Sequence, residues 1–200
     1  MRSDTRRNIS SLLAAVGEEI EVNAQGVTLQ SVAARAGVAK ATAYRYFSSL
    51  DELTTAYTVQ SMQQMRQFST ESTLKGEELF RSVLGQWVAM VFDHGHVMVQ
   101  LRSRKGYLDR FDHGDPVIDV SREIWERPMS ELLSEKGLSQ SLLRHALFLC
   151  NIFVDPREVL DLRNSESMTA EQIVSDLDST IHGAVVGWQQ PSPRNGGPKW

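Results

Sequence analysis

The fold is decided by the stretch Thr28-Leu29-Gln30-Ser31-Val32-Ala33-Ala34-Arg35-Ala36-Gly37-Val38, near the start of a chain of 200 residues. Thr28 is suited to cap a helix that begins at Leu29, and Gly37 is suited to end that helix in the left-handed conformation. A second short helix follows and carries Lys40-Ala41-Thr42-Ala43-Tyr44-Arg45-Tyr46. The stretch therefore predicts helix, tight turn and helix, preceded by an amphipathic helix of about fifteen residues.

The remainder of the chain is dominated by helical periodicity, and no alternating pattern predicts a strand. We therefore predict an all-α protein in which an N-terminal three-helix helix-turn-helix domain is joined to a C-terminal helical bundle. The expected domains are residues 1–49 for the helix-turn-helix, 50–190 for the bundle and 191–200 for a disordered tail. The helices expected in the bundle, from their caps and breakers, span residues 50–68, 77–104, 116–136, 139–154 and 169–188.

Composition excludes several classes of protein. With 41% apolar and 23% charged residues, the chain has the composition of a folded protein. The longest near-apolar stretch, residues 146–154, is too short to span a membrane, and the polar N-terminus has no signal peptide, so we expect a cytoplasmic protein. The single cysteine, Cys150, lies in an apolar run, which predicts a buried, inert thiol, with a reactive thiol as the alternative.

Charge is distributed unevenly along the chain. Residues 1–50 contain six basic and four acidic side chains, whereas the remainder contains 15 basic and 21 acidic ones. A slightly basic end on an acidic protein is typical of a molecule that contacts phosphate at that end only.

The second short helix has a surface suited to DNA. On a helical wheel Ala43 and Phe47 point inward, so that Arg45 points outward with two tyrosines at its shoulders. Arginine can form two hydrogen bonds with a guanine edge, small side chains can contact a thymine methyl group, and tyrosine hydroxyls can donate to phosphates. The predicted DNA-binding residues are Arg6, Arg7, Thr28, Lys40, Ala41, Thr42, Tyr44, Arg45 and Tyr46. For Arg6 and Arg7 the alternative is a merely solvated chain end.

Residues 8–55 resemble the DNA-binding motif of the TetR family of helix-turn-helix transcriptional regulators. The resemblance rests on the stretch 28–38, followed by Thr42-x-Tyr44-x-Tyr46-Phe47 and by Leu53. It implies a homodimer whose two recognition helices enter successive major grooves of a palindromic operator. It also implies a repressor that a small ligand releases from DNA.

Two positions depart from the family's pattern. Ala39 stands where a serine commonly caps the recognition helix, so about 0.5–2 kcal/mol of capping free energy is forgone. Leu50 stands where a lysine often contacts phosphate. Affinity for DNA is therefore expected to depend more on Arg6, Arg7 and Lys40.

A stripe of aromatic and polar side chains lies in the middle of the expected bundle, because positions 87, 91, 94 and 98 share one helix face. The stripe is either simple core packing or the wall of a ligand cavity, which the family has among the corresponding helices. Methionine and aromatic side chains favour a small apolar or aromatic effector, with His94 as a polar anchor. The predicted ligand-binding residues are Met62, Met65, Trp87, Val91, His94, Met98, Tyr107, Trp125 and Met129, with Phe68 and Phe111 as further candidates.

The last two expected helices have wide apolar faces that suit a four-helix dimer interface, with intrachain packing as the alternative. Gly183 and Gly187 would permit close approach of two backbones. The predicted interface residues are Leu142, Leu149, Phe153, Ile173, Leu177, Ile181, Ala184 and Trp188.

A metal-dependent enzyme or a metal-sensing repressor is the alternative function. Its candidate ligands are Asp93, His94 and His96 in one group and Asp112, His113 and Asp115 in another. In a helix, residues 94 and 96 point about 200° apart and cannot share one ion. No serine-histidine-aspartate motif or phosphate-binding glycine loop occurs in the sequence either. We therefore expect no catalytic residue, no metal and no cofactor.

Overall fold

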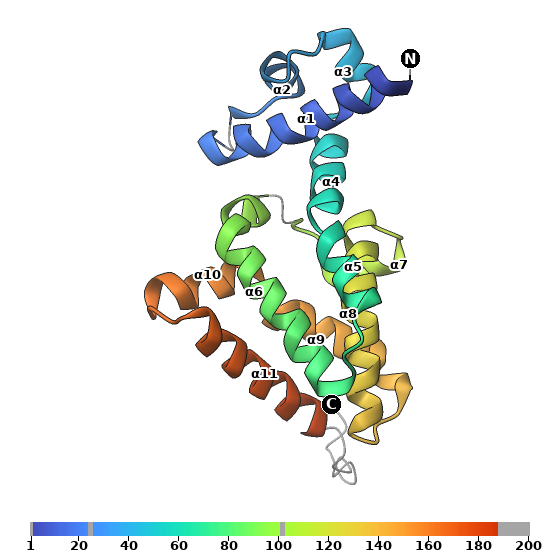
Figure 1. Ribbon diagram of the computed structural model, residues 1–200, viewed down its shortest axis with the longest axis vertical. Helices are drawn as coiled ribbons and strands as arrows, with labels where there is room; N and C mark the ends of the chain where they lie inside the picture. The colour runs from blue at the N-terminus through green and yellow to red at the C-terminus, as the bar shows by residue number, and fades with distance from the viewer. Residues whose placement is uncertain (1, 24–25, 101–102, 188–200) are drawn as a thin grey trace, which may run out of the picture.

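The structure is a computed structural model that describes residues 2–23, 26–100 and 103–187, and within these ranges every regular element is a helix (Figure 1). The prediction of an all-α protein is confirmed. Three helices stand at one end of the molecule, and we refer to them as the head: α1 (Arg2–Asn23), α2 (Leu29–Arg35) and α3 (Lys40–Tyr46).

The remaining helices form the body, and α4 runs down into it from the head (Figure 1). They are α4 (Leu50–Ser61), α5 (Gln63–Glu71), α6 (Gly76–Gln100), α7 (Tyr107–Asp112), α8 (Pro116–Glu135), a 3-10 turn (Gln140–Leu142), α9 (Leu143–Phe153), α10 (Pro156–Ser165) and α11 (Ala170–Gly187). Of the helices described, none is long and apolar enough to cross a membrane.

The helix-turn-helix has the boundaries that its sequence predicts. The Thr28 hydroxyl accepts a hydrogen bond from the Ser31 backbone N–H at 3.0 Å, and the Ser31 hydroxyl accepts one from the Thr28 N–H at 3.0 Å, which is a reciprocal cap. Gly37 has a φ of +66°, so it ends α2 in the left-handed region that glycine adopts without strain. As expected, Ala39 offers α3 no side-chain cap.

The single helix expected over residues 50–68 is wrong, because Met62 separates α4 from α5. The Ser61 hydroxyl donates to the Tyr57 carbonyl at 2.9 Å, and the Thr58 hydroxyl donates to the Thr54 carbonyl at 2.9 Å. Such back-bonding competes for the carbonyls of the helical ladder and bends helices. Periodicity alone does not reveal this competition.

Other boundaries also differ from expectation. The short helices α7 and α10 were not predicted. Asp155-Pro156, which directly follows the helix expected over residues 139–154, caps and begins α10. The segment 139–154 begins with the 3-10 turn, α1 has 22 residues, and α6, described as far as Gln100, does not include residues 103 and 104. The expected tail 191–200 lies outside the described residues, as does Trp188.

Two hydrophobic cores hold the molecule together. The head core includes Leu12, Val16, Val32 and Ala43, and it also takes in Leu53 from α4 and Val97 from α6. The larger body core is built on α6, α8, α9 and α11. Cys150 lies in it with 1% of its surface exposed, and burial raises the pKa of its thiol, so the predicted buried cysteine is confirmed.

Arg127 fastens the connection between α5 and α6 to α8. Its Nε donates to a Glu131 carboxylate oxygen at 2.9 Å. Its terminal nitrogens donate to four backbone carbonyls, those of Ser69, Thr70, Ser72 and Leu74, at distances of 3.0 to 3.1 Å. One guanidinium group thus satisfies acceptors that the C-terminus of α5 leaves without helical partners.

Candidate DNA-binding face and ligand cavity

Helix α3 has one buried side and one exposed side. Ala43 is completely buried and Phe47 is 7% exposed, so the inward pair predicted on the helical wheel is confirmed. Tyr44 is 47% exposed, and Arg45 is also exposed on the opposite side of the helix from this pair. The head therefore presents α3 outward, with its bulky polar side chains in solvent.

Arg45 and Tyr46 form one unit on this face. The Arg45 guanidinium lies 5.2 Å from the centre of the Tyr46 ring and donates to the Tyr46 hydroxyl at 3.4 Å. Hydrogen bonding with the side chain of Thr5, and then with Arg45, lowers the pKa of the Tyr46 hydroxyl. Tyr46 therefore ties α3 to the start of α1 and holds Arg45 beside the exposed face.

Other residues predicted to bind DNA surround this unit. Lys40 is exposed and donates to the Gln30 side-chain oxygen at 2.7 Å, which makes Gln30 a neighbour that the sequence analysis did not single out. Arg7 pairs with Asp4 at 3.1 Å. Arg6, Thr28 and Ala41 are exposed and Thr42 is half-buried. Leu50 packs partly against the head core.

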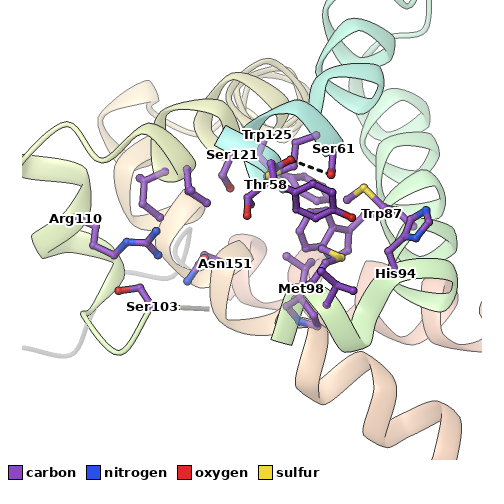
Figure 2. A pocket seen from close by; sticks show the side chains of 18 residues that line it. Thr58, Ser61, Trp87, His94, Met98, Ser103, Arg110, Ser121, Trp125 and Asn151 are labelled. Atoms are coloured by element: carbon purple, nitrogen blue, oxygen red, sulfur yellow. Dashed lines mark hydrogen bonds between the residues drawn. The ribbon is translucent and has the colours of Figure 1, made fainter. Parts of the chain in front are cut away.

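A cavity of about 100 Å³ lies in the body beside α4 and α6 (Figure 2). Its wall is mostly apolar, but polar groups stand at both ends. Figure 2 shows Arg110, Ser103 and Asn151 at one end and His94 at the other, with Met98 between them. The lining residues are Tyr57, Thr58, Ser61, Met62, Trp87, Met90, His94, Val97, Met98, Ser103, Arg110, Val117, Ile118, Ser121, Trp125, Asn151, Val154 and Pro156.

Five of the predicted ligand-binding residues line this cavity: Met62, Trp87, His94, Met98 and Trp125. The Trp87 indole N–H donates to the Val154 carbonyl at 2.8 Å, so only the apolar surface of its ring is available to a ligand. His94 is exposed and stands at the mouth. Arg110 has both carboxylate oxygens of Asp115 as partners, at 2.9 and 3.0 Å.

The other predicted ligand-binding residues belong to the core. Met65, Val91 and Met129 are buried in it and do not line the cavity. Tyr107 packs against the rings of Phe111 and Phe148, and burial raises its pKa to about 12. Phe68 packs against the same core. The side chains at these positions face neighbouring helices. They therefore pack in the core and do not form the wall of the cavity.

Two cavity residues also pack in the head. Val97 is 3% exposed and belongs to the head core, although it is on α6. Tyr57, which packs against the same core, faces Gly17 of α1 so closely that a Cβ at Gly17 would lie 2.7 Å from the Tyr57 hydroxyl. The cavity wall and the head therefore share side chains.

The described members of the two predicted metal groups pair with arginines or lie in solvent. Asp112 pairs with Arg144 at 2.8 Å, Asp115 pairs with Arg110 and caps α8, and Asp93 is exposed. The side chain of His96 is not among those described. Among the described side chains, neither group brings three donor atoms together.

The predicted dimer residues fall into two sets. Ile173, Leu177 and Ile181 point into the body core, so these three take part in intrachain packing. Leu142, Leu149, Phe153 and Ala184 are half-buried. Ile152 at 45% and Val186 at 42% exposure are the most exposed apolar side chains of α9 and α11, and Gly183 and Gly187 are exposed beside Val186.

Comparison with known proteins assigns the head. Residues 12–57 match the family model of the bacterial regulatory proteins of the tetR family. No curated protein matches the chain in sequence.

Solved structures share the fold over nearly the whole chain. A transcriptional regulator from Pseudomonas aeruginosa PAO1 has a TM-score of 0.62 at 12% identity, over 93% of this chain and 92% of that one. The regulator FadR from Bacillus subtilis, in complex with stearoyl-CoA, has a TM-score of 0.62 at 18% identity, over 88% of this chain and 97% of that one. A TetR regulator from Rhodococcus sp. RHA1 has a TM-score of 0.59 at 19% identity, over 92% and 98%.

The family match covers the helix-turn-helix, and the shared fold extends over the body. The resemblance drawn from the sequence is therefore confirmed for residues 12–57, which match the bacterial regulatory proteins of the tetR family, and the body shares the fold of solved transcriptional regulators.

Proposed function

We propose that this regulator is a repressor that binds a palindromic operator as a homodimer in the cytoplasm and leaves it when a small apolar or aromatic molecule enters the body. The observation that carries the proposal is the sharing of Tyr57 and Val97 between the cavity wall and the head core. A ligand that displaces either side chain disturbs the packing that orients the head. Ligand binding and DNA binding are coupled in this way.

The DNA-binding unit in this proposal is residues 1–57, a little longer than the 1–49 expected from the sequence. Leu50 and Leu53 pack with the head core, so the first turns of α4 move with the head. The effector-binding unit then begins in the second half of α4, where Thr58 and Ser61 line the cavity.

Helix α3 enters the major groove, where Arg45 reads a base edge and Ala41 and Thr42 contact neighbouring bases. Arg45 leaves the Tyr46 ring to do so, which costs little because Arg45 is exposed. Tyr44 and Tyr46 contact the backbone, and Lys40, Arg6, Arg7 and Thr28 add phosphate contacts. Since α3 lacks a side-chain cap, DNA contacts also stabilise its first turn.

The effector is small and largely apolar. A cavity of about 100 Å³ is well below the 300–1,000 Å³ typical of ligand pockets, and a dry cavity of about 150 Å³ binds benzene. One aromatic ring therefore suits the cavity, whereas a chain as long as that of the stearoyl-CoA held by FadR requires the body to open. Met90 and Met98 are the flexible side chains that yield first.

A selection of bound sequences from a random pool of double-stranded DNA tests the proposal. We expect a palindromic consensus with half-sites about one helical turn apart. The Arg45→Ala variant should bind this operator about tenfold more weakly than the wild type, because a base contact is lost, and should bind random DNA almost as well.

Arg35→Ala is the matched control for this experiment. Arg35 is an exposed arginine of the same head, but its guanidinium is held by Glu19 and Glu18. Its removal changes the net charge equally and should leave operator preference intact. A pool that yields no palindrome would overturn the proposed dimeric operator, and equal losses by Arg45→Ala on operator and random DNA would overturn base reading by Arg45.

The dimer is proposed to form through the outer faces of α9 and α11. Ile152→Glu should then weaken dimerisation at least about tenfold, because a carboxylate would lose its water in an apolar interface. Sedimentation velocity measures the effect. Val22→Glu, which changes an apolar side chain of α1 that is 76% exposed, is the control and should remain dimeric. A monomeric wild type, or a dimeric Ile152→Glu variant, would contradict this interface.

A further inference from the structure

A cluster of ionisable side chains joins the start of α6 to the second half of α11, far from the head. Glu77 comes from α6, and Asp178 and His182 lie four residues apart on α11, which places them on the same face of that helix. One donor atom from each residue lies within 4.8 Å of the other two. Two helices thus bring a nitrogen donor and two carboxylates to one point.

Asp178 is buried more deeply than an aspartate at a surface ion pair. Only 5% of the residue is exposed. One carboxylate oxygen, Oδ2, accepts from Arg81 at 3.0 Å, whereas Oδ1 is buried, lies 3.2 Å from His182 Nδ1 and accepts no well-formed hydrogen bond from the described residues. A buried carboxylate oxygen that accepts no well-formed hydrogen bond is costly, and a cation bound at that position would offset the cost.

His182 is oriented as a metal-binding histidine is. Its Nδ1 lies 3.0 Å from the Asp178 backbone carbonyl, which fixes the proton on Nδ1 and leaves the Nε2 lone pair free. Nε2 is buried, has no hydrogen-bond partner in the described part of the chain, and faces Glu77 Oε2 at 3.5 Å. Two ligand atoms on one tetrahedral zinc ion lie about 3.3 Å apart, close to this separation.

The charged side chains around the cluster carry one more negative charge than positive charges. The acids Glu77, Asp178 and Glu135 face two permanent cations, Arg81 and Lys136, in this part of the body. Lys136 donates to Glu77 Oε2 at 2.9 Å, the same oxygen that faces His182. Lys136 also interacts with Glu135, which gives its ammonium group another partner when Glu77 turns toward an ion.

We propose that Glu77, Asp178 and His182 bind one divalent transition-metal ion, which clamps α6 to α11. An imidazole nitrogen with two carboxylates suits zinc and its neighbours better than calcium or magnesium. Arg81 is the outer group that orients the Asp178 carboxylate. The site is distinct from the cavity and from the Asp93 and Asp112 regions, and it does not depend on the proposed operator or effector.

The alternative occupant of this position is a proton, which would make His182 an imidazolium between two carboxylates. The two possibilities differ in stoichiometry and metal dependence. Full-length protein stripped with EDTA is titrated with zinc chloride by calorimetry, and its thermal unfolding is followed with and without zinc. If the site binds metal, we expect one zinc ion per chain and a higher Tm in the presence of zinc. If His182 is instead an imidazolium, we expect neither.

Variants assign the ion to these residues. His182→Gln and Glu77→Gln should weaken zinc binding at least about tenfold, and Glu77→Gln keeps the fold because Glu77 is exposed. His113→Gln is the matched control, because His113 also follows an aspartate, Asp109, by four residues but both are exposed and no third ligand is near. Absence of stoichiometric zinc binding, or equal binding by wild type and Glu77→Gln, would overturn the proposal.

Discussion

An Arg127→Leu variant is expected to lose about 3 kcal/mol in the free energy of unfolding. The substitution removes a charged donor from the carbonyls of Ser69, Thr70, Ser72 and Leu74. Hydrogen bonds to charged groups contribute about 1.5–3 kcal/mol each, but water replaces some of them because the Arg127 side chain is 30% exposed. Urea unfolding followed by circular dichroism measures the loss.

Arg66→Leu is the control for this prediction. Arg66 also connects α5 with α8, through Glu123 at 2.9 Å, but both side chains are about 40% exposed and no carbonyl depends on them. A surface ion pair of this kind contributes about 0–1 kcal/mol. If the two leucine variants lose the same free energy, Arg127 does not hold the α5–α6 connection as its hydrogen bonds indicate.

Local signals were sufficient for the parts of the fold that local chemistry determines. The Thr28 cap, the Gly37 stop, the Asp115-Pro116 start of α8 and the stop at Gly137, with a φ of +68°, all lie where the sequence places them. In contrast, the break at Met62 coincides with hydroxyl-to-carbonyl bonds such as that of Ser61, which also occur in the uninterrupted helices α8 and α11 and so do not by themselves predict a break. The helices α7 and α10 have six and ten residues, which is too short for periodicity to stand out.

The candidate sites, too, were predictable only where local sequence determines them. The buried side of α3 follows from its wheel, because the helix is short and packs on one face. The lining of the cavity does not follow from a helical wheel. Val91 and His94 share one helix face in the sequence, yet Val91 is fully buried and His94 is exposed at the end of the cavity. Arg110 and Asn151 reach the cavity only through the positions of α7 and α9. Helix α11 has an apolar stripe whose partner, α6, only the structure identifies.

The contact between Gly17 and Tyr57 is expected to be the most sensitive point between head and body. A Cβ at Gly17 would lie 2.7 Å from the Tyr57 hydroxyl oxygen and 2.9 Å from Cζ, so any side chain there requires the Tyr57 ring, which lines the cavity, to move. Gly17→Val should therefore destabilise the protein by about 3 kcal/mol, at the upper end of the cost of overpacking. Gly85→Val on α6 is the control, because a Cβ there meets no atom within 4 Å.

A second substitution at Tyr57 shows whether the ring transmits the strain. With Tyr57→Ala the side chain at position 17 has room, so the double variant should lose at least about 1 kcal/mol less than the sum of the single losses. Operator affinity, measured on folded protein, should fall in Gly17→Val and not in Gly85→Val, although neither residue is on α3. Additive losses would show that the ring does not carry the strain. Unchanged operator affinity in Gly17→Val would show that the head does not sense displacement of a side chain in the cavity wall.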